Sequence, residues 1–154
     1  MNINDVCDYI ITKLTEGGED LNLLKLQKLL YYVQAWHLAF KDTPLFENKF
    51  QAWVHGPVNR EIYDRFNNEK TLYSQITQED VRTDFVLESI DTDNQLVIDN
   101  VLEIYAPYSG TQLEEMTHNE KPWISARDGY RSSQRCEVTL DESLIGDYYR
   151  ARLT

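Results

Sequence analysis

Residues 21–40 constrain the fold of this chain more than any other stretch. They read LNLLKLQKLLYYVQAWHLAF, and the apolar residues are not confined to one stripe of a helical projection. Such a distribution indicates a helix that protein surrounds on most of its circumference. With Asn22 as the N-cap, the helix would run for about 19 residues, or roughly 28 Å at 1.5 Å per residue. We therefore expect a central helix on which the rest of the chain packs.

The few polar residues of this helix fall on two strips, and we expect both strips to be exposed. At 100° per residue, one strip contains Gln27, Gln34, His37 and Lys41. We interpret it as a polar edge at the surface or, alternatively, as a hydrogen-bonded strip facing a partner, which makes Gln34 and His37 candidate partner contacts. Lys25 and Lys28 form the second strip, near the start of the helix.

The segments on either side of residues 21–40 predict a helix and a short strand. Residues 3–14 repeat apolar side chains every three or four positions, with Asn4 expected to cap this helix and Gly17 to end it. Cys7 falls on the apolar face and is expected to be a small buried hydrophobe. Residues 50–54 alternate as a strand, and a further helix is expected to begin at Pro57.

The second half of the chain predicts three more helices. One ends before Pro107, a short one begins with a capping box of Ser109 and Gln112, and the last begins near Asp141. Residues 138–140 are expected to form a short strand paired with residues 50–54. The predicted fold is mainly α, a compact single-domain helical bundle around a buried central helix, with at most a small two-stranded β element. One domain is expected to span residues 1–154.

The composition excludes several classes of function. The chain has 154 residues, and 26 acidic against 15 basic side chains give a formal charge of −11, which repels phosphate backbones and anionic lipid. We therefore expect neither direct nucleic-acid binding nor membrane association. Cys7 and Cys136 stand far apart without a CxxC pair, which suits a reduced cytoplasm. The N-terminus is acidic where a signal peptide is basic, and no apolar run approaches the roughly 18 residues of a spanning helix.

The negative charge is concentrated between residues 79 and 103. This stretch holds eight acidic residues and one basic residue, Arg82, for a local charge of −7. We interpret it as a solvated helix face or, alternatively, as a docking surface for a basic protein partner, whose encounter this field would accelerate. The candidate partner surface on this stretch consists of Glu79, Asp80, Asp84 and Glu88.

We recognise no catalytic constellation. His118 and Glu120 form the first half of a zinc-deaminase pattern, but the Pro-Cys-x-x-Cys half is missing. His37, His55 and His118 lack the spacing of an HExxH helix, and the chain has no GxGxxG, Walker or GxSxG motif. We therefore assign no catalytic residue, no metal ligand and no cofactor. His118 and Glu120 are interpreted as a polar latch that holds a tight loop beside Trp123.

Three motifs carry a resemblance to a known family. They are LQKLLYY at residues 26–32, AWVHGPV at residues 52–58 and THNEKPW at residues 117–123. In this order, and with the segments from the first helix to the last, they resemble the Panacea-domain family, which includes SocA-like antitoxins and phage-associated GepA-like proteins. The resemblance implies a non-enzymatic, mainly helical antitoxin of a type II toxin–antitoxin system. Such a protein neutralises a cognate protein toxin by direct binding, and the toxin is expected to be encoded by the adjacent gene.

The signature residues implied by this resemblance serve as scaffold or as partner contacts. They are Gln27, Tyr31, Tyr32, Trp36, Trp53, His55, Gly56, Pro57, Val58, His118, Glu120, Pro122 and Trp123. We favour a scaffold, because an interface matched to unrelated toxins should vary while the core that presents it should not.

Two alternatives to direct neutralisation stay open. A SocA-type member delivers its toxin to a bacterial protease, so this chain could be a proteolytic adaptor with a protease as its second partner. The other alternative is a small metal-dependent hydrolase or nuclease that uses His118 or His55. Some relatives carry an additional DNA-binding domain, for which we expect no room in this chain.

Overall fold

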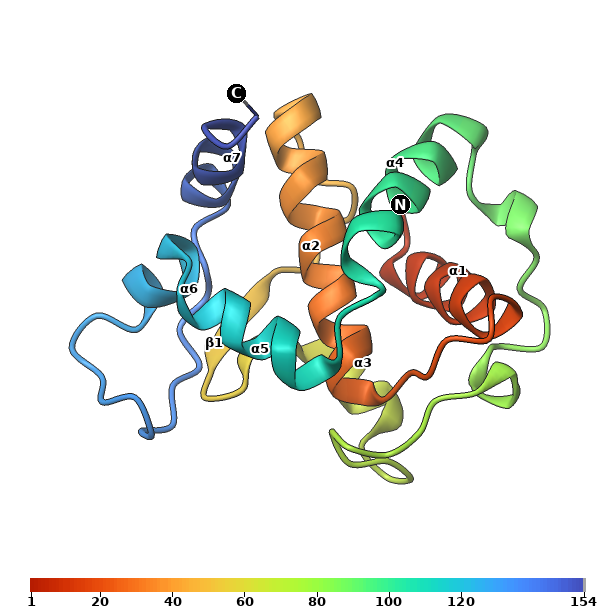
Figure 1. Cartoon of the computed structure of the whole chain (residues 1–154), viewed down its shortest axis with the longest axis horizontal. Coiled ribbons are helices and arrows are strands. Elements are labelled where there is room, and N and C mark those ends of the chain that lie inside the picture. The colour runs from red at the N-terminus through yellow and green to blue at the C-terminus, as the bar shows by residue number, and fades with distance from the viewer. Residues whose placement is uncertain (154) are drawn as a thin grey trace.

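Helix α2 (Leu23–Lys41) runs through the middle of the computed structural model, which describes residues 1–153. It packs against α7 on one side, against α4 and α1 on the other, and against α5 and β2 (Figure 1). The surrounding elements are α1 (Ile3–Glu16), β1 (Phe50–Trp53), β2 (Gly56–Asn59), α3 (Arg60–Phe66), the single turns η1 (Gln78–Asp80) and η2 (Leu87–Ser89), α4 (Thr92–Tyr105), α5 (Gly110–His118), α6 (Lys121–Ala126) and α7 (Glu142–Arg150). The predicted fold class, a mainly helical bundle around a buried central helix with a small two-stranded sheet, is confirmed.

Side chains cap three helices that begin where the sequence predicts a helix start. The Asn22 side chain accepts a hydrogen bond from the Lys25 N–H at 2.8 Å and starts α2. Ser109 and Gln112 form the reciprocal capping box of α5, and Asp141 caps α7. Each cap satisfies amide groups that have no partner inside the helix, which fixes where these elements begin.

Two predicted helix starts are wrong. The side chain of Asn2, not that of Asn4, caps α1, and Asn4 lies in the first turn. Pro57 belongs to β2, and α3 starts at Arg60 with Asn59 as its cap. The fixed φ of proline suits an extended strand as well as a first helical turn, so local chemistry did not distinguish the two.

Strands β1 and β2 form an antiparallel hairpin, and a third segment extends the sheet. Thr139 bridges to Gln51 on the free side of β1. The Ala52 N–H donates to the Val138 carbonyl, and the N–H of residue 140 donates to the carbonyl of residue 50, each at 2.8 Å. The predicted pairing of residues 138–140 with residues 50–54 is confirmed.

The expectation of two exposed polar strips on α2 is wrong except at Lys41, which is exposed at the end of the helix. Exposed fractions are at most 7% for Lys25, Gln27, Lys28, Gln34 and His37. Phe40, placed by the projection among buried residues, is 55% exposed. The helical projection fails because these five polar side chains are covered by the rest of the same chain and lie within hydrogen-bond distance of its backbone.

Cys7 lies in the core, as the sequence predicts. It is fully buried, and burial raises the pKa of its thiol to about 12. The thiol is therefore protonated at neutral pH and packs as a small apolar group.

Helix α2 is largely apolar but short, at 19 residues. Across residues 1–153, no helix combines the length and the apolar character needed to cross a membrane.

Candidate functional site

Many of the signature residues meet around the β1–β2 hairpin. Trp53 lies opposite Gly56, so residues 54 and 55 form a two-residue turn. Gly56 has a φ of +92°, and a Cβ at this position would lie 2.6 Å from Lys28 Cε and 2.7 Å from Thr117 Oγ1. Glycine is required here by the backbone conformation and by the close approach of α2 and α5.

Helix α2 holds β2 through two buried side chains. Gln27 Nε2 donates to the Asn59 carbonyl at 3.0 Å, and the Asn59 N–H donates to Gln27 Oε1 at 2.8 Å, as a neighbouring strand would. Lys28 Nζ donates to the Pro57 carbonyl at 2.8 Å. Burial lowers the pKa of Lys28 to about 7, against the opposing effect of the Glu114 charge. The outer edge of β2 is therefore closed by α2.

Gln34 and His37 hold the loop that follows α2. Gln34 Oε1 accepts from the Leu45 N–H at 2.8 Å, and its Nε2 donates to the Phe46 carbonyl at 2.7 Å. His37 Nδ1 lies 2.6 Å from the Thr43 carbonyl, and burial lowers its pKa. The interpretation of Gln34 and His37 as partner contacts is therefore wrong, because both side chains are buried against their own chain.

Helices α5 and α6 hold the other side of the hairpin. His118 Nε2 donates to the Val54 carbonyl at 2.9 Å, and Trp123 Nε1 donates to the Trp53 carbonyl at 2.8 Å. The two rings stack, with centroids 4.1 Å apart, and burial lowers the pKa of His118. The predicted latch beside the Trp123 indole thus holds the hairpin turn.

Arg127 completes the clamp that His118 and Trp123 form on the hairpin, and the sequence did not predict it. Its side chain is buried; Nη1 donates to the Ala52 carbonyl at 2.8 Å and Nη2 to the Arg131 carbonyl at 2.7 Å. Helix α6, which positions Arg127, was also missed, although Pro122 in its first turn is a helix-start signal.

Glu120 ties α7 to α2. The hydroxyl groups of Tyr32 and Tyr149 both donate to Glu120 Oε1, each at 2.8 Å. Burial raises the pKa of Glu120, while the two phenol hydrogen bonds act in the opposite direction. Tyr31 continues the network, because its hydroxyl lies 3.2 Å from that of Tyr149. Glu120 is thus a joint between helices and not part of the loop latch.

The remaining signature residues divide into packed and exposed ones. Val58 is fully buried, and Trp36 Nε1 donates to the Tyr105 hydroxyl at 2.8 Å. The His55 side chain is 41% exposed, with Nδ1 3.0 Å from a carboxylate oxygen of Glu114. Trp53 is partly exposed on the outer face of β1. Most signature side chains therefore act within the fold.

A buried ion cluster connects the acidic stretch to α1 and α3, and the sequence did not predict it. Asp8 has no exposed surface. Its two carboxylate oxygens accept from Arg65 Nη2 at 2.5 Å and from Arg82 Nε at 2.6 Å. Arg82 also pairs with Asp5. The one basic residue between residues 79 and 103 is therefore neutralised by α1 and does not offset its acidic neighbours in sequence.

The four carboxylates of the candidate partner surface differ in their surroundings. Asp80 lies 3.5 Å from Lys70 Nζ and is partly buried. Glu79, Asp84 and Glu88 are exposed, and within residues 1–153 none has a basic nitrogen within 4.0 Å. These three carboxylates are uncompensated.

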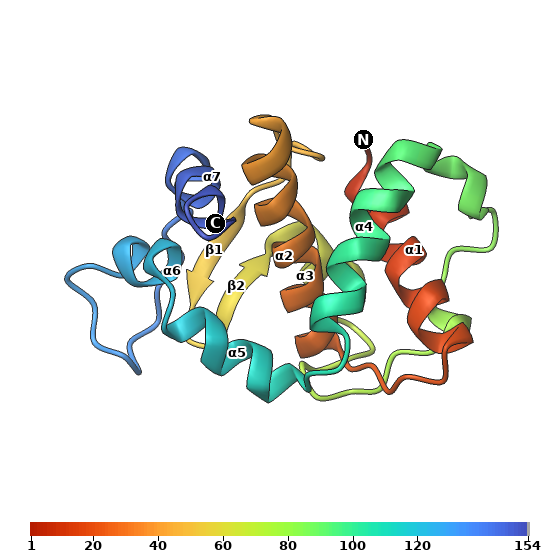
Figure 2. The same ribbon diagram turned by 45° about the horizontal axis from the view of Figure 1, so that its top comes forward.

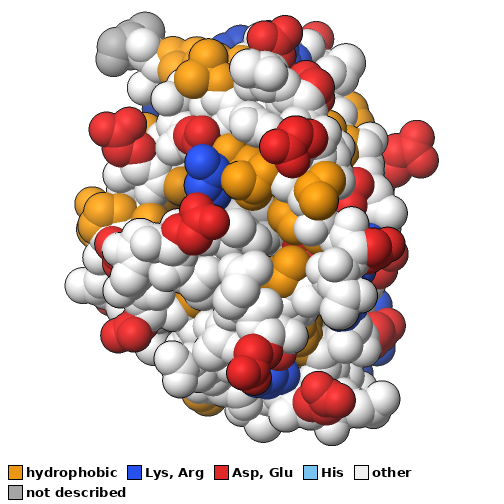
Figure 3. Space-filling view, turned by 90° about the vertical axis from the view of Figure 1, so that its right-hand side faces the viewer, with side chains coloured by type: hydrophobic (Ala, Val, Ile, Leu, Met, Phe, Trp, Pro, Cys, Tyr) orange, Lys and Arg blue, Asp and Glu red, His pale blue; other side chains and the backbone are white. Residues whose placement is uncertain are grey.

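Helix α4 extends this surface with exposed apolar side chains. Leu96 and Ile104 are 61% and 60% exposed, and Asp93 and Glu103 are exposed at matching helical spacing. Figure 3 shows this side of the molecule, where acidic side chains lie among hydrophobic ones. We name the following residues the acidic face: Glu79, Asp84, Glu88, Asp93, Leu96, Glu103 and Ile104.

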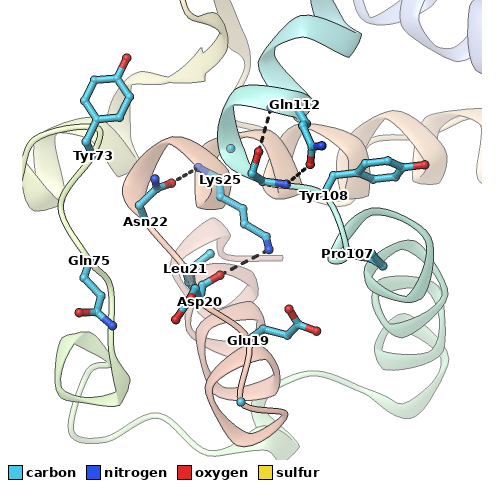
Figure 4. Close-up of a pocket in the computed structure, with 13 residues that line it drawn as sticks. Glu19, Asp20, Leu21, Asn22, Lys25, Tyr73, Gln75, Pro107, Tyr108 and Gln112 are labelled. Carbon is cyan, nitrogen blue, oxygen red and sulfur yellow. Dashed lines mark hydrogen bonds between the residues drawn. The ribbon is translucent and has the colours of Figure 1, made fainter.

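A pocket of about 650 Å³ lies where the first turns of α2 and α5 meet the α1–α2 loop (Figure 4). Its lysine, Lys25, donates to the Ala106 carbonyl at 2.6 Å and to the Asp20 carbonyl at 3.4 Å. Asn22 and Ser109 cap the two helices. Because these polar groups already have partners, we assign no ligand to this pocket.

The three histidines do not converge. His37 contacts the Thr43 carbonyl, His55 contacts Glu114, and His118 contacts the Val54 carbonyl. In the part of the chain that the structure describes, residues 1–153, no group of three or more His, Cys, Asp or Glu is placed to hold a metal ion.

The fold and the site define a class of protein, a helical scaffold that presents a clamped hairpin and an acidic face. A family model described as "Antitoxin SocA-like, Panacea domain" matches residues 26–124, and the chain belongs to this family. It is 26% identical over 151 residues to Antitoxin SocA of Caulobacter vibrioides (strain NA1000 / CB15N), covering 94% of this chain and 80% of that protein. No solved structure matches the chain. The family description indicates an antitoxin role.

Proposed function

We propose that this chain is the antitoxin of a type II toxin–antitoxin system and neutralises a cognate protein toxin by binding it directly in the cytoplasm. Membership of the SocA-like family supports the antitoxin role, and the adjacent gene is the first place to look for the toxin. We further propose that the chain is a binder and not an enzyme. The engagement of Gln27, His118, Glu120 and Trp123 within the fold supports a scaffold role for them.

The observation that carries direct binding is the acidic face. Its carboxylates are exposed and uncompensated, while Leu96 and Ile104 add apolar area that water covers only at a cost. A protein surface that combines basic and apolar side chains complements this face. The negative field would raise the association rate with such a surface by roughly ten- to a thousandfold at low salt.

Co-expression tests the proposal. We expect this chain to rescue growth of cells that express the protein encoded beside it, and an affinity tag on this chain to recover that protein as a complex. Death of the cells together with failure to isolate a complex would overturn direct neutralisation. The half-life of the partner distinguishes direct neutralisation from delivery to a protease. Direct neutralisation leaves this half-life unchanged or longer, whereas a proteolytic adaptor would shorten it.

A further inference from the structure

The small sheet has one open edge. Around Thr139 the hydrogen bonds to β1 use the carbonyl of Val138 and the N–H of Leu140. In this antiparallel pattern the N–H and C=O of Thr139 point away from β1. Neither group has a hydrogen-bond partner among residues 1–153, and Glu137, Val138 and Thr139 are exposed. Residues 137–139 therefore present unpaired backbone to solvent, which is a template for another strand.

The opposite edge of the sheet differs. There Gln27 occupies the N–H and C=O of Asn59, and Lys28 occupies the carbonyl of Pro57. The fold closes the β2 edge with buried side chains and leaves the edge at residues 137–139 uncovered. A partner strand can add to the sheet on this side alone.

A pocket of about 430 Å³ adjoins the open edge. One wall is aromatic: the rings of Trp53 and Tyr63 meet edge to face with centroids 4.9 Å apart, and the Arg60 guanidinium lies 5.4 Å from the Trp53 ring. Glu137 and Arg135 line the side that belongs to the edge segment. A side chain projecting from an added strand has room to enter this pocket.

The charges in this pocket favour a carboxylate. Arg60 and Arg135 both pair with the same oxygen, Oε1 of Glu137, at 3.4 and 3.2 Å. At these distances two guanidinium groups share one carboxylate. Asp64 is a second acidic neighbour of Arg60, but its Oδ1 lies 3.9 Å from Arg60 Nε, beyond hydrogen-bond distance. The side chains of Arg60 and Arg135 are substantially exposed, at 47% and 82%. Guanidinium groups bind carboxylates in paired hydrogen bonds, so a second carboxylate has donors available here.

We propose that the edge at residues 137–139 receives an extended segment of the toxin as an added β-strand, with an acidic side chain of that segment held between Arg60 and Arg135. This inference rests on the function proposed above. Backbone hydrogen bonds to Thr139 supply the affinity of such strand addition, and the pocket supplies its specificity. The toxin is thereby assigned an acid-bearing, extended segment.

The position of the edge means that the bound segment must reach away from the body of the toxin. Figure 2 shows β1 and β2 near the segment that joins α6 to α7, at the end of the molecule away from α1 and α4. The acidic face includes α4, so the body of a toxin docked there lies at the other end. A tail or loop spans roughly 3.3 Å per residue when extended, which lets it reach around the molecule to residues 137–139.

Substitution of Thr139 by proline tests the backbone contact. Thr139→Pro removes the outward N–H and leaves intact the two hydrogen bonds to β1, which use residues 138 and 140; proline is tolerated at an open strand edge for this reason. Thr139→Ala is the matched control, because it alters the side chain and keeps the N–H. We expect affinity for the protein encoded beside this chain to fall at least about tenfold in Thr139→Pro relative to Thr139→Ala.

Hydrogen exchange on the wild-type complex provides a second measurement that does not depend on the folding of a variant. We expect the amide of Thr139 to gain protection when the complex forms. Arg60→Glu should weaken the complex, while Lys41→Glu, an exposed charge reversal at the end of α2, should not.

The outcomes separate this inference from the proposed function. A complex that forms with equal affinity in the proline and alanine variants, or without protection at Thr139, overturns strand addition and leaves direct neutralisation standing. If Thr139→Pro does not fold, the exchange result decides. If wild-type protein forms no complex at all, the proposed function fails and strand addition fails with it.

Discussion

Lys28 provides a sharp test of whether α2 supports the β1–β2 hairpin through buried side chains. Its ammonium group is fully buried beneath β2, and burial lowers its pKa from 10.5 to about 7. The unfolded chain restores the ordinary value, so between these two pKa values the unfolded state binds more protons than the folded state. The free energy of unfolding should therefore rise with pH above about 7 and show no contribution from Lys28 titration well below that pH.

The size of this effect follows from the difference in bound protons. One full proton changes the free energy of unfolding by about 1.4 kcal/mol per pH unit. A folded pKa near 7 therefore gives a gain on the order of 2 kcal/mol between about pH 7 and about pH 8.5. Cys7 sets the upper limit of the pH range for this test. Burial raises the pKa of its thiol to about 12, so stability is lost as pH rises above the ordinary thiol pKa, at which the unfolded chain releases this proton. Burial lowers the pKa values of His37 and His118, which places their titration below the window.

Urea unfolding followed by tryptophan fluorescence measures this dependence. We expect the wild-type protein to gain stability from about pH 7 to about pH 8.5, and Lys28→Met, which removes the titrating group and keeps the length of the side chain, to lose most of that gain. Equal slopes in the two proteins, or a flat wild-type curve, would refute the assignment of a buried, pKa-shifted lysine under the hairpin.

Three further predictions concern the same clamp. Gly56→Ala should lower the free energy of unfolding by about 2–4 kcal/mol, because it adds a Cβ against Lys28 and Thr117 at a positive φ. Urea unfolding measures this loss. A loss below about 1 kcal/mol would contradict the close approach of α2 and α5 to Gly56. Gln27→Ala should cost a similar amount, since it leaves the buried N–H and C=O of Asn59 without partners, and Gln27→Glu should not restore both bonds because a carboxylate has no donor. His118→Gln should weaken the fall in stability as pH drops below about 6.5, because burial lowers the His118 pKa and favours its neutral form in the folded state. Thermal unfolding measured against pH checks this prediction. A pH profile equal to that of the wild-type protein would contradict it.

The sequence predicted the elements whose signals are local. Asn22 and Ser109 were recognised as helix caps because a cap and the amide that it binds lie within three residues of each other. The start of the last helix near Asp141 was also predicted. The central helix was recognised because its apolar residues occupy most of its circumference. Pro57 was misplaced because its φ fits two kinds of element, and only the pairing with β1 selects the strand.

The errors at the candidate site have a different origin. Projection of α2 separates polar from apolar side chains but does not reveal whether a polar side chain meets water or a backbone group of its own chain. Gln34 binds the backbone of residues 45 and 46, and Lys28 binds the carbonyl of Pro57. Arg127 and Asp8 were missed because their partners lie far away in sequence. The acidic stretch was visible in the sequence. The engagement of Arg82 by α1, which leaves Glu79, Asp84 and Glu88 uncompensated, was not.

The association rate with the protein encoded beside this chain tests direct binding through the acidic face most directly. The comparison uses Asp84→Lys/Glu88→Lys against Glu47→Lys/Glu115→Lys, an equal change in net charge at exposed positions outside the face. At low salt we expect the first pair to slow association about tenfold and the second less than about twofold, with the difference shrinking as salt screens the charges. Equal slowing by both pairs, or no slowing by either, would contradict docking on the acidic face.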